Sequence, residues 1–336
     1  MTAQLQGPLA VVTGGAGFIG SNLVANLTKT GIWAVVVCDW LGDDDKWRNL
    51  AKHTIVHVVA PEDLLTFLDE NNSAVDVIIH MGAISSTTER DVDRIFRNNF
   101  IFSRDLWRWA SRHQKRFIYA SSAATYGDGS VGFSDEGTIE ALNRLRPLNP
   151  YGWSKHLFDQ FVARELDNGR DHPPQWAGLK FFNVYGANEY HKGSMKSVVA
   201  QIFSKVARGE PVTLFRSHHP DYQDGGQLRD FIYVRDCSQV VSWLLKNHHV
   251  SGLFNLGTGN ARSFADLAKA VFAALNRKVS IEYVDTPDEI RDRYQYYTQA
   301  DMSKIRSAGY ADDFTALEDG IADYVRGYLT QDDPYL

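Results

Sequence analysis

The chain has 336 residues, of which 44% are hydrophobic and 23% charged, enough to bury a sizeable core in one large α/β domain or in two domains that share an interface. Its formal net charge of -6 argues against a surface for nucleic acid and leaves room only for a local basic pocket. The N-terminus has no signal-peptide pattern, and no apolar run approaches the roughly 18 residues that span a bilayer, so we expect a cytoplasmic protein that binds neither membranes nor nucleic acid.

The first predicted elements form a dinucleotide-binding turn. Leu9–Thr13 is an apolar, β-branched run typical of a buried strand, and residues 21–27 predict a helix. Between them stand Gly14, Gly17 and Gly20, with the spacing G-x-x-G-x-x-G of a variant dinucleotide fingerprint. The first glycine is expected to make the tight turn, the second to let the backbone approach a pyrophosphate at the helix N-terminus, and the third to allow close helix packing.

The next predicted strand, Ala34–Cys38, ends in an acid that bears on the choice of cofactor. Asp39 lies about twenty residues past the glycines, where a carboxylate accepts hydrogen bonds from the adenosine ribose and favours NAD. Lys46 and Arg48 in the following loop could neutralise the 2′-phosphate of NADP, although the three aspartates at 43–45 equally indicate ordinary solvated charges. The residues alone leave NAD and NADP open.

Two further predicted strands end in residues suited to a ligand crevice. Val75–His80 is followed by the small residues of 81–85, which fit a place where a cofactor passes over the sheet edge. Asn98, in the helical stretch that comes next, either anchors a loop or contacts the cofactor. The strand Phe117–Ala120 leads to Ser122, whose hydroxyl either caps a turn or donates a hydrogen bond to a substrate oxygen.

Tyr151 and Lys155, at the start of the next predicted helix, suggest acid/base chemistry. Residues four apart share a helix face, so the ammonium is expected to favour the phenolate and to lower the pKa of Tyr151 from about 10. A phenol tuned in this way can act as a general acid/base near neutral pH. The spacing alone is common on surface helices, but the glycine turn, Ser122 and this pair follow one another in the order of an oxidoreductase-type active site.

The second half of the chain has a different rhythm. Leu179–Phe182 is expected to be a further strand of the core sheet, after which short helices and strands alternate with many aromatic residues. We therefore predict an α/β fold with a Rossmann-type doubly wound parallel sheet over residues 1–180, to which the chain returns near 229–258. A smaller mixed α/β substrate domain is expected over residues 181–336.

Residues of this second half are expected to bind the substrate. Phe215 offers a ring that stacks on a base, and Arg229 a guanidinium that binds a diphosphate in a bidentate way. The histidines at 218 and 219 lack an accompanying cysteine or carboxylate cluster, and Cys38 and Cys237 indicate separate buried thiols, so no metal site is expected. The expected substrate contacts are Asn183, Ser194, Gln201, Phe215, Arg216, Ser217, His218, Arg229 and Tyr294.

Motifs spread over almost the whole chain resemble the extended short-chain dehydrogenase/reductase superfamily of nucleotide-sugar-modifying enzymes. They are the segments Thr13–Gly20, Ala120–Gly127, Pro150–Lys155, Arg229–Val234 and Phe254–Gly259. Within this superfamily the chain is most similar to the family of ADP-L-glycero-D-manno-heptose 6-epimerases of lipopolysaccharide-core synthesis. That similarity rests on Gly82–Glu89, Ser121–Gly127, Phe182–Gly186, His191–Val198 and Arg293–Gln295.

The resemblance implies a tightly held NADP rather than NAD, with Lys46 as the partner of the 2′-phosphate, and Lys192 as a second acid/base group. It also implies a small nucleotide-sugar substrate, ADP-heptose, and a homo-oligomer in the form of a pentamer. The chain departs from the family pattern in the acidic loop after Asp39, which carries Trp40 and Trp47. The expected cofactor contacts are Gly14, Gly17, Phe18, Ile19, Gly20, Asp39, Trp40, Lys46, Met81, Gly82, Ala83, Ile84, Ser85, Asn98, Tyr151, Lys155, Val184 and Lys192.

The reaction implied is inversion at C6 of the heptose, from D-glycero to L-glycero. A carbinol C–H is too weak an acid for direct proton abstraction, so the expected route is transient oxidation to a carbonyl and re-reduction from the other face. Rotation about one exocyclic bond presents that face but moves the oxygen, which calls for two acid/base groups. Tyr151 and Lys192 are the candidates, with neither assigned to one epimer. Lys155 is expected to tune Tyr151 and hold the nicotinamide ribose, and Ser122 to orient the oxygen.

Two alternatives stand beside this expectation. The first is a 4-epimerase or 4,6-dehydratase of another nucleotide sugar, but a dehydratase should carry an acidic pair beside its Ser/Thr, and Ser122-Ala123-Ala124 offers none. The second is a non-catalytic dinucleotide-binding scaffold, which the intact set of Ser122, Tyr151 and Lys155 counts against.

Overall fold

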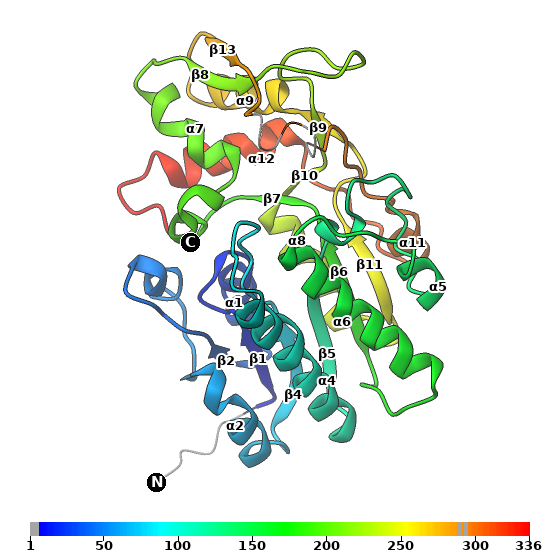
Figure 1. The fold of residues 1–336 in the computed structure, drawn as a ribbon. Helices are drawn as coiled ribbons and strands as arrows, with labels where there is room; N and C mark the ends of the chain where they lie inside the picture. Colours follow the sequence, from blue (N-terminus) through cyan, green and yellow to red (C-terminus); the bar gives the residue numbers. More distant parts are fainter. Residues whose placement is uncertain (1–6, 288–290, 292–294) are drawn as a thin grey trace.

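The computed structural model describes residues 7–287, 291 and 295–336. Its core is a seven-stranded sheet in the order β11-β6-β5-β4-β1-β2-β3, in which every neighbouring pair is parallel (Figure 1). The predicted doubly wound parallel sheet is therefore confirmed. The strands are β1 (Leu9–Thr13), β2 (Ala34–Cys38), β3 (His57–Val59), β4 (Val75–His80), β5 (Arg116–Ser122), β6 (Trp176–Phe181) and β11 (Gly252–Leu256).

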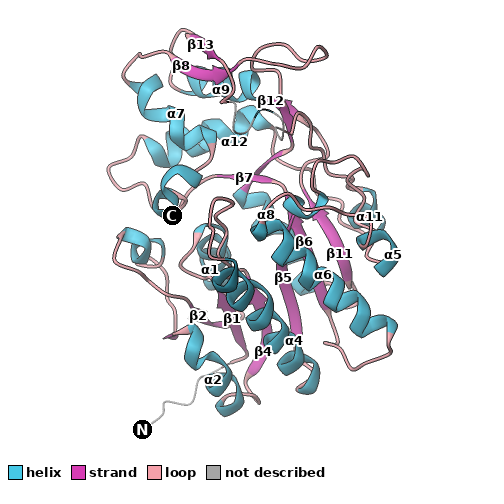
Figure 2. Cartoon of the chain, viewed as in Figure 1, coloured by secondary structure: helices cyan, strands magenta, loops and turns pink. Residues whose placement is uncertain are grey.

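Helices cover both faces of this sheet. Helices α4 and α6 lie on one face, and α1 and α8, which pack against each other, cover the other (Figure 2). Strand β1 is buried along its whole length, as expected for a continuous apolar run in a parallel sheet covered on both sides. The helices of this part are α1 (Phe18–Thr30), α2 (Leu64–Glu70), α3 (Val92–Ile95), α4 (Phe102–Arg112), α5 (Ile139–Leu142), α6 (Pro150–Asp167), α8 (Val234–Lys246) and α11 (Ser303–Ser307).

Short helical turns connect these elements at the edges of the sheet. Three are 3-10 turns, and the fourth, η3, is a π-helical turn that runs directly into α4. Turns of the π type inside helices occur often at functional sites. The four are η1 (Asp45–Asn49), η2 (Pro61–Asp63), η3 (Phe96–Ile101) and η4 (Ala123–Tyr126).

The strand order creates a crevice at the carboxyl ends of the strands. The chain passes from β1 to β2 on one side and later reaches β4 on the other side of β1. In doubly wound sheets, ligands bind where the connections diverge in this way. The glycine turn leaves β1 at this point, and residues 81–85 leave β4 beside it.

The second half of the chain forms a smaller mixed layer over that end of the sheet (Figure 1). Its helices and strands pack around a second apolar cluster, distinct from the cluster that surrounds the large sheet. The chain returns to the large sheet for α8 and β11. The predicted division at residue 180 stays a prediction. The strand pairs are β7 (Asn183–Tyr185) with β10 (Phe231–Tyr233), β8 (Val212–Phe215) with β13 (Ile281–Val284), and β9 (Leu228–Arg229) with β12 (Arg262–Ser263).

The helices of the second half are amphipathic and turn their apolar sides to this cluster. In the described part of the chain, no helix is both long and apolar enough to cross a membrane. The helices and turns are α7 (Val198–Ala207), α9 (Phe264–Ala274), α12 (Leu317–Tyr324), η5 (Tyr190–Met195) and the π-helical turn η6 (Val325–Leu329).

Candidate active site

A cavity of about 540 Å³ lies at the carboxyl ends of the central strands. Its wall comes from the turns after β1, β2, β4 and β5, the start of α6, and the segment from β7 to η5. Every residue expected from the sequence to contact the cofactor lines this cavity, and so does Ser122. The roles of these residues stay predictions, but their convergence from segments far apart in the chain makes this the candidate active site.

The glycine turn has space for nothing larger than glycine at two positions. Gly14 has φ +65°, and a Cβ added to it would lie 2.6 Å from the backbone of Gly82. A Cβ at Gly20 would lie 2.0 Å from the carbonyl oxygen of Gly14. The turn is therefore folded tightly on itself and pressed against the segment that follows β4.

The N-terminus of α1 opens into the same cavity. Gly17 is its N-cap residue, and among the described residues no side chain caps this end and no acid stands in its first turn. Backbone N–H groups and the helix dipole at such an end favour a bound anion. The tight glycine turn and this helix end fit the pyrophosphate of a dinucleotide.

The end of β2 carries an ion pair beside the glycine turn. The Asp39 carboxylate accepts a hydrogen bond from the backbone N–H of Ala16 (2.9 Å) and one from Lys46 Nζ (2.7 Å). Lys46 lines the cavity, whereas the guanidinium of Arg48 lies over the ring of Tyr335, 4.3 Å from its centroid. Of the two cations weighed in this loop, Lys46 is therefore the one beside the ligand space.

Helix α6 places Tyr151 against the turn that follows β5. Asn149 caps the helix by accepting a hydrogen bond from the Gly152 N–H (2.8 Å). A Cβ at Gly152 would lie 2.7 Å from the carbonyl oxygen of Ala124, so the helix start and turn η4 are in close contact. This contact brings the Tyr151 hydroxyl within hydrogen-bonding reach of Ser122.

The expected lowering of the Tyr151 pKa is wrong for this structure. Burial raises the pKa of Tyr151, and the hydrogen bond to Ser122 only partly opposes that rise. The Lys155 ammonium donates to the carbonyl oxygen of Ala120 (2.8 Å), so it is engaged by strand β5. Burial lowers the pKa of Lys155 itself to about 8, and the Asp159 carboxylate opposes this shift. The helical spacing predicted that Tyr151 and Lys155 share a face, but not that the Lys155 ammonium points to strand β5.

Lys192 approaches the cavity from η5. Its Nζ lies 5.4 Å from the centroid of the Phe18 ring, and its backbone N–H donates to the carbonyl of Glu189 (3.1 Å). The turn is broken after it by Gly193 at φ +54°. Burial lowers the pKa of Lys192, with the Glu189 carboxylate opposing the shift. A lysine with a lowered pKa can exchange protons closer to neutral pH than a free one.

Asn99 supports the cavity wall from the protein interior, and the sequence did not single it out. Asn98 lines the cavity, and its amide donates to the Arg94 carbonyl (2.8 Å). Asn99 is fully buried and bonds both the N–H (2.8 Å) and the carbonyl (3.0 Å) of Ile84. It also donates to the Ser154 hydroxyl of α6 (3.0 Å). It thereby ties the segment after β4 to the helix of Tyr151, and the Asn-Asn pair alone could not show which amide does so.

The described residues expected to bind the substrate lie outside the lining of this cavity. Gln201 donates to the carbonyls of Ser194 (3.1 Å) and Lys196 (2.7 Å), and so supports the loop after Lys192. Tyr294 lies outside the described residues. Those that the structure describes are Asn183, Ser194, Gln201, Phe215, Arg216, Ser217, His218 and Arg229.

Neither histidine of the 218–219 pair is arranged for a metal. His218 Nε2 accepts from the N–H of Thr286 (3.3 Å), and the ring of His219 packs against Tyr222 and Tyr296. Across residues 7–287, 291 and 295–336, no group of three or more His, Cys, Asp or Glu side chains is placed to hold a metal ion.

The C-terminal strap, residues 332–336, contacts two loops of the cavity wall. The Tyr335 ring lies under Arg48 in η1, and the Leu336 N–H donates to Asn188 Oδ1 (3.0 Å) just before η5. Lys52 Nζ donates to the Tyr335 carbonyl (2.7 Å). This segment therefore joins the loop of Lys46 to the loop of Lys192.

Comparison with known proteins places this geometry in a family. The family model described as the NAD dependent epimerase/dehydratase family matches residues 10–257. A relative from Nitratidesulfovibrio vulgaris, named ADP-L-glycero-D-manno-heptose-6-epimerase, is 50% identical over 97% of this chain and 99% of its own length. A relative of the same name from Fusobacterium nucleatum is 41% identical over 98% of this chain and 100% of its own.

Solved structures give the same picture. The crystal structure of Helicobacter pylori ADP-L-glycero-D-manno-heptose-6-epimerase has a TM-score of 0.79 and 28% identity, and the match covers 97% of this chain and 98% of that one. Thermus thermophilus UDP-glucose 4-epimerase, solved with NAD, matches with a TM-score of 0.73 and 24% identity over 95% and 99% of the two chains, which shows a shared fold.

Proposed function

The chain belongs to the NAD-dependent epimerase/dehydratase family, and from this premise we propose that it is an ADP-L-glycero-D-manno-heptose 6-epimerase. It converts the D-glycero to the L-glycero form for lipopolysaccharide-core heptose synthesis. The observation that carries the proposal has two parts. The chain is similar to the named relative over nearly its full length, and Ser122, Tyr151, Lys155 and Lys192 line one cavity.

The cavity fits a nicotinamide dinucleotide through the glycine turn and the uncapped start of α1. When bound, this cofactor supplies the reversible oxidation of the C6 carbinol to a carbonyl. Support for NADP over NAD comes from Lys46, which lines the cavity and already neutralises Asp39. We therefore propose that Lys46 holds the 2′-phosphate.

The side chains divide the proton transfers between two walls of the cavity. In each direction, one of the Tyr151 and Lys192 side chains takes the proton of the C6 hydroxyl, as phenolate or free amine. The other returns a proton to the C6 oxygen, as phenol or ammonium. Ser122, which bonds the Tyr151 hydroxyl, orients the reacting oxygen. Lys155 would hold the nicotinamide ribose when the cofactor is bound. Two proton-transfer groups are needed because rotation of the exocyclic carbon moves the oxygen from one wall to the other.

A substrate panel tests the proposal. The purified protein is incubated separately with ADP-D-glycero-D-manno-heptose, UDP-glucose and dTDP-glucose, and the products are resolved by anion-exchange chromatography and NMR. We expect conversion of the ADP-heptose alone, toward a mixture of both C6 epimers. Turnover of UDP-glucose or dTDP-glucose with an inert ADP-heptose would overturn the assignment.

Two further parts of the proposal rest on resemblance. The residues expected to bind the nucleotide and sugar, from Asn183 to Tyr294, would meet the part of the substrate that extends beyond the cavity. The protein is proposed to be a homo-oligomer of five subunits, which light scattering coupled to size-exclusion chromatography checks directly.

A further inference from the structure

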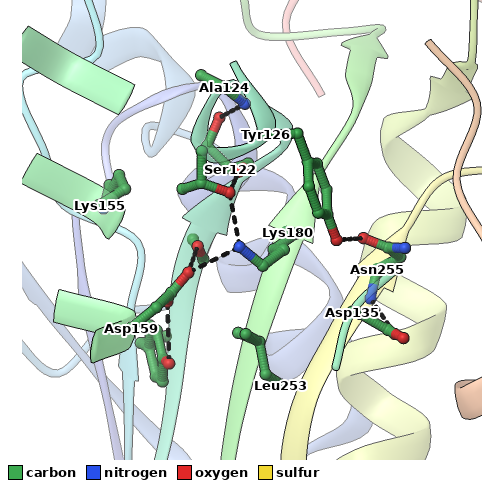
Figure 3. A network of polar contacts seen from close by, with 12 residues as sticks. Ser122, Ala124, Tyr126, Asp135, Lys155, Asp159, Lys180, Leu253 and Asn255 are labelled. Atoms are coloured by element: carbon green, nitrogen blue, oxygen red, sulfur yellow. Dashed lines mark hydrogen bonds and ion pairs between the residues drawn. The ribbon is translucent and has the colours of Figure 1, made fainter. Parts of the chain in front are cut away.

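A buried ion pair lies beneath the residues of the proposed active site. Asp159 Oδ2 on α6 and Lys180 Nζ on β6 are 2.9 Å apart, and their side chains are 0% and 1% exposed (Figure 3). Neither residue lines the cavity. The mechanism described above uses neither of them.

The pair is bonded to the strand and turn that carry Ser122. Asp159 accepts hydrogen bonds from Ser121 Oγ (2.7 Å) and Tyr119 Oη (3.1 Å) on β5. Lys180 donates to Thr125 Oγ1 (2.6 Å) in η4. Thr125 in turn donates to the carbonyl oxygen of Ser122 (2.8 Å). One connected set of bonds thus joins α6, β5, η4 and β6 directly below the contact between Ser122 and Tyr151.

Asp159 also stands in line with the two site residues of α6. Tyr151, Lys155 and Asp159 follow one another at intervals of four, which places them on one helix face. The Asp159 carboxylate is the charge that raises the pKa of Lys155 against the effect of burial. Without the Asp159 charge, burial would lower the pKa of Lys155 with no charge to oppose it.

The other titratable groups around Lys155 do not supply a negative charge. Burial lowers the pKa of His80 to about 3 and that of His156 to about 4, so both rings are neutral near pH 7. Burial raises the pKa values of Tyr119 and Tyr151, so both phenols are neutral as well. The groups on the packed elements are His80 on β4, Tyr119 on β5, Lys180 on β6, and Tyr151, His156 and Asp159 on α6.

Stability alone is a weak explanation for such a pair. A buried ion pair often contributes little net stability, and well-packed apolar residues of similar volume frequently serve as well or better. An apolar pair could fill the space between α6 and β6. Such an apolar pair could not accept hydrogen bonds from the hydroxyls of Ser121 and Tyr119. It could also not place a negative charge near Lys155.

We infer that Asp159 and Lys180 are positioning residues of the proposed epimerase: Lys180 fixes the turn of Ser122 against α6, and Asp159 keeps Lys155 an ammonium. This inference rests on the proposed function for its effect on turnover, but not for its effect on Lys155. The two halves of the pair therefore have different tasks, and their variants should behave differently.

The test compares Asp159→Asn, Lys180→Met and the double variant in the full-length protein. The first readout is the pH dependence of kcat for ADP-heptose epimerisation. The second, which needs no substrate, is competitive acetylation of Lys155 by acetic anhydride across pH, read by peptide mass spectrometry. Asp76→Asn is the matched control. Asp76 on β4 pairs with Arg116 (2.5 Å) at the amino end of β5, which is the end away from the cavity.

For Asp159→Asn we expect the acetylation midpoint of Lys155 and the basic limb of kcat to move down by roughly one to two pH units. The reason is that Lys155 loses its proton as the pH rises through its pKa. Without the Asp159 carboxylate that pKa is lower, so the proton is lost at a lower pH. Activity should fall by about tenfold or more at pH 8 and much less at pH 6. Lys180→Met should lower kcat at all pH values without moving the midpoint down, and Asp76→Asn should move neither readout.

The double variant keeps the test valid if Asp159→Asn does not fold. Removing both charges leaves no unpaired buried ion, so its unfolding temperature should exceed that of either single variant, while its Lys155 midpoint stays low. An unchanged midpoint in a folded variant that lacks Asp159 would overturn the inference. A wild-type protein that does not convert ADP-heptose would overturn the proposed function, and the acetylation readout would still decide the role of Asp159.

Discussion

At the scale of single residues, the cavity holds two lysines in unlike surroundings. Lys155 is buried on α6 and donates to a strand carbonyl, whereas Lys192 lies on a short turn near the Phe18 ring. Each has one carboxylate nearby in the sequence, Asp159 and Glu189, that opposes the lowering of its pKa by burial. In the proposed mechanism, Lys155 holds the ribose and Lys192 moves a proton.

We predict that Tyr151→Phe and Lys192→Met each lower the rate of inversion by at least roughly 10²-fold, because each removes one of two proton-transfer groups. Both variants should still fold and still bind NADP. Lys205→Met, which changes an exposed lysine on α7, is the control. The measurement is the epimer ratio over time by NMR. Full activity in Lys192→Met would remove the two-group mechanism, and retained activity in both variants would remove the site.

Lys46 carries the prediction on cofactor choice. Lys46→Met should weaken NADP binding by roughly 10-fold or more, because the partner of the 2′-phosphate is lost and the Asp39 charge is exposed to it. Binding of NAD, which has no such phosphate, should change little. Titration calorimetry of cofactor-free protein with both nucleotides measures the difference. An equal loss for NAD and NADP would show that Lys46 supports the loop rather than the phosphate.

At the scale of elements, local patterns predicted what depends on neighbours in the chain. The strands at 9–13, 34–38 and 75–80 have the expected bounds, because a short apolar run carries its own signal. The glycine turn and the shared face of Tyr151 and Lys155 follow from the same kind of local rule. The direction of the Lys155 ammonium could not be predicted, because it depends on Ala120, which β5 brings close only in the fold.

Asn99 shows the same limit within one element. The π-helical turn η3 sets which of two adjacent amides points inward, and no periodic pattern indicates such a turn. We predict that Asn99→Ala lowers the free energy of unfolding by about 1–3 kcal/mol, because it removes the side-chain partner of the partly buried Ile84 N–H and carbonyl. Asn98→Ala, the neighbouring change at a half-buried amide, should cost less. Chemical denaturation of both variants checks this, and an equal cost would argue against the clamp.

At the scale of the whole molecule, the site is assembled from both halves of the chain. The large sheet and helix α6 supply the glycine turn, Ser122 and Tyr151, while η5 in the second half supplies Lys192. The C-terminal strap joins these parts, because its contacts reach both the loop of Lys46 and the loop of Lys192. Contacts of such long sequence separation leave no signal in the sequence of the strap itself.

Tyr335→Ala tests this link. Loss of the ring removes the contacts with Arg48 and with Tyr190, whose ring centroid lies 5.2 Å away. We expect faster hydrogen exchange in residues 44–52 and 186–196 and a several-fold weaker affinity for NADP, while exchange in the central strands stays unchanged. Unaltered exchange in both loops would show that the strap merely rests on them.

The most direct test of the account follows the hydrogen at C6. ADP-D-glycero-D-manno-heptose carrying deuterium at C6 is incubated in ordinary water with the purified protein and no added cofactor, and the product is analysed by NMR and mass spectrometry. Oxidation and re-reduction within one closed site should return the same hydrogen, so the account predicts an L-glycero product that retains its deuterium. A product that has exchanged its C6 label for solvent hydrogen would contradict it.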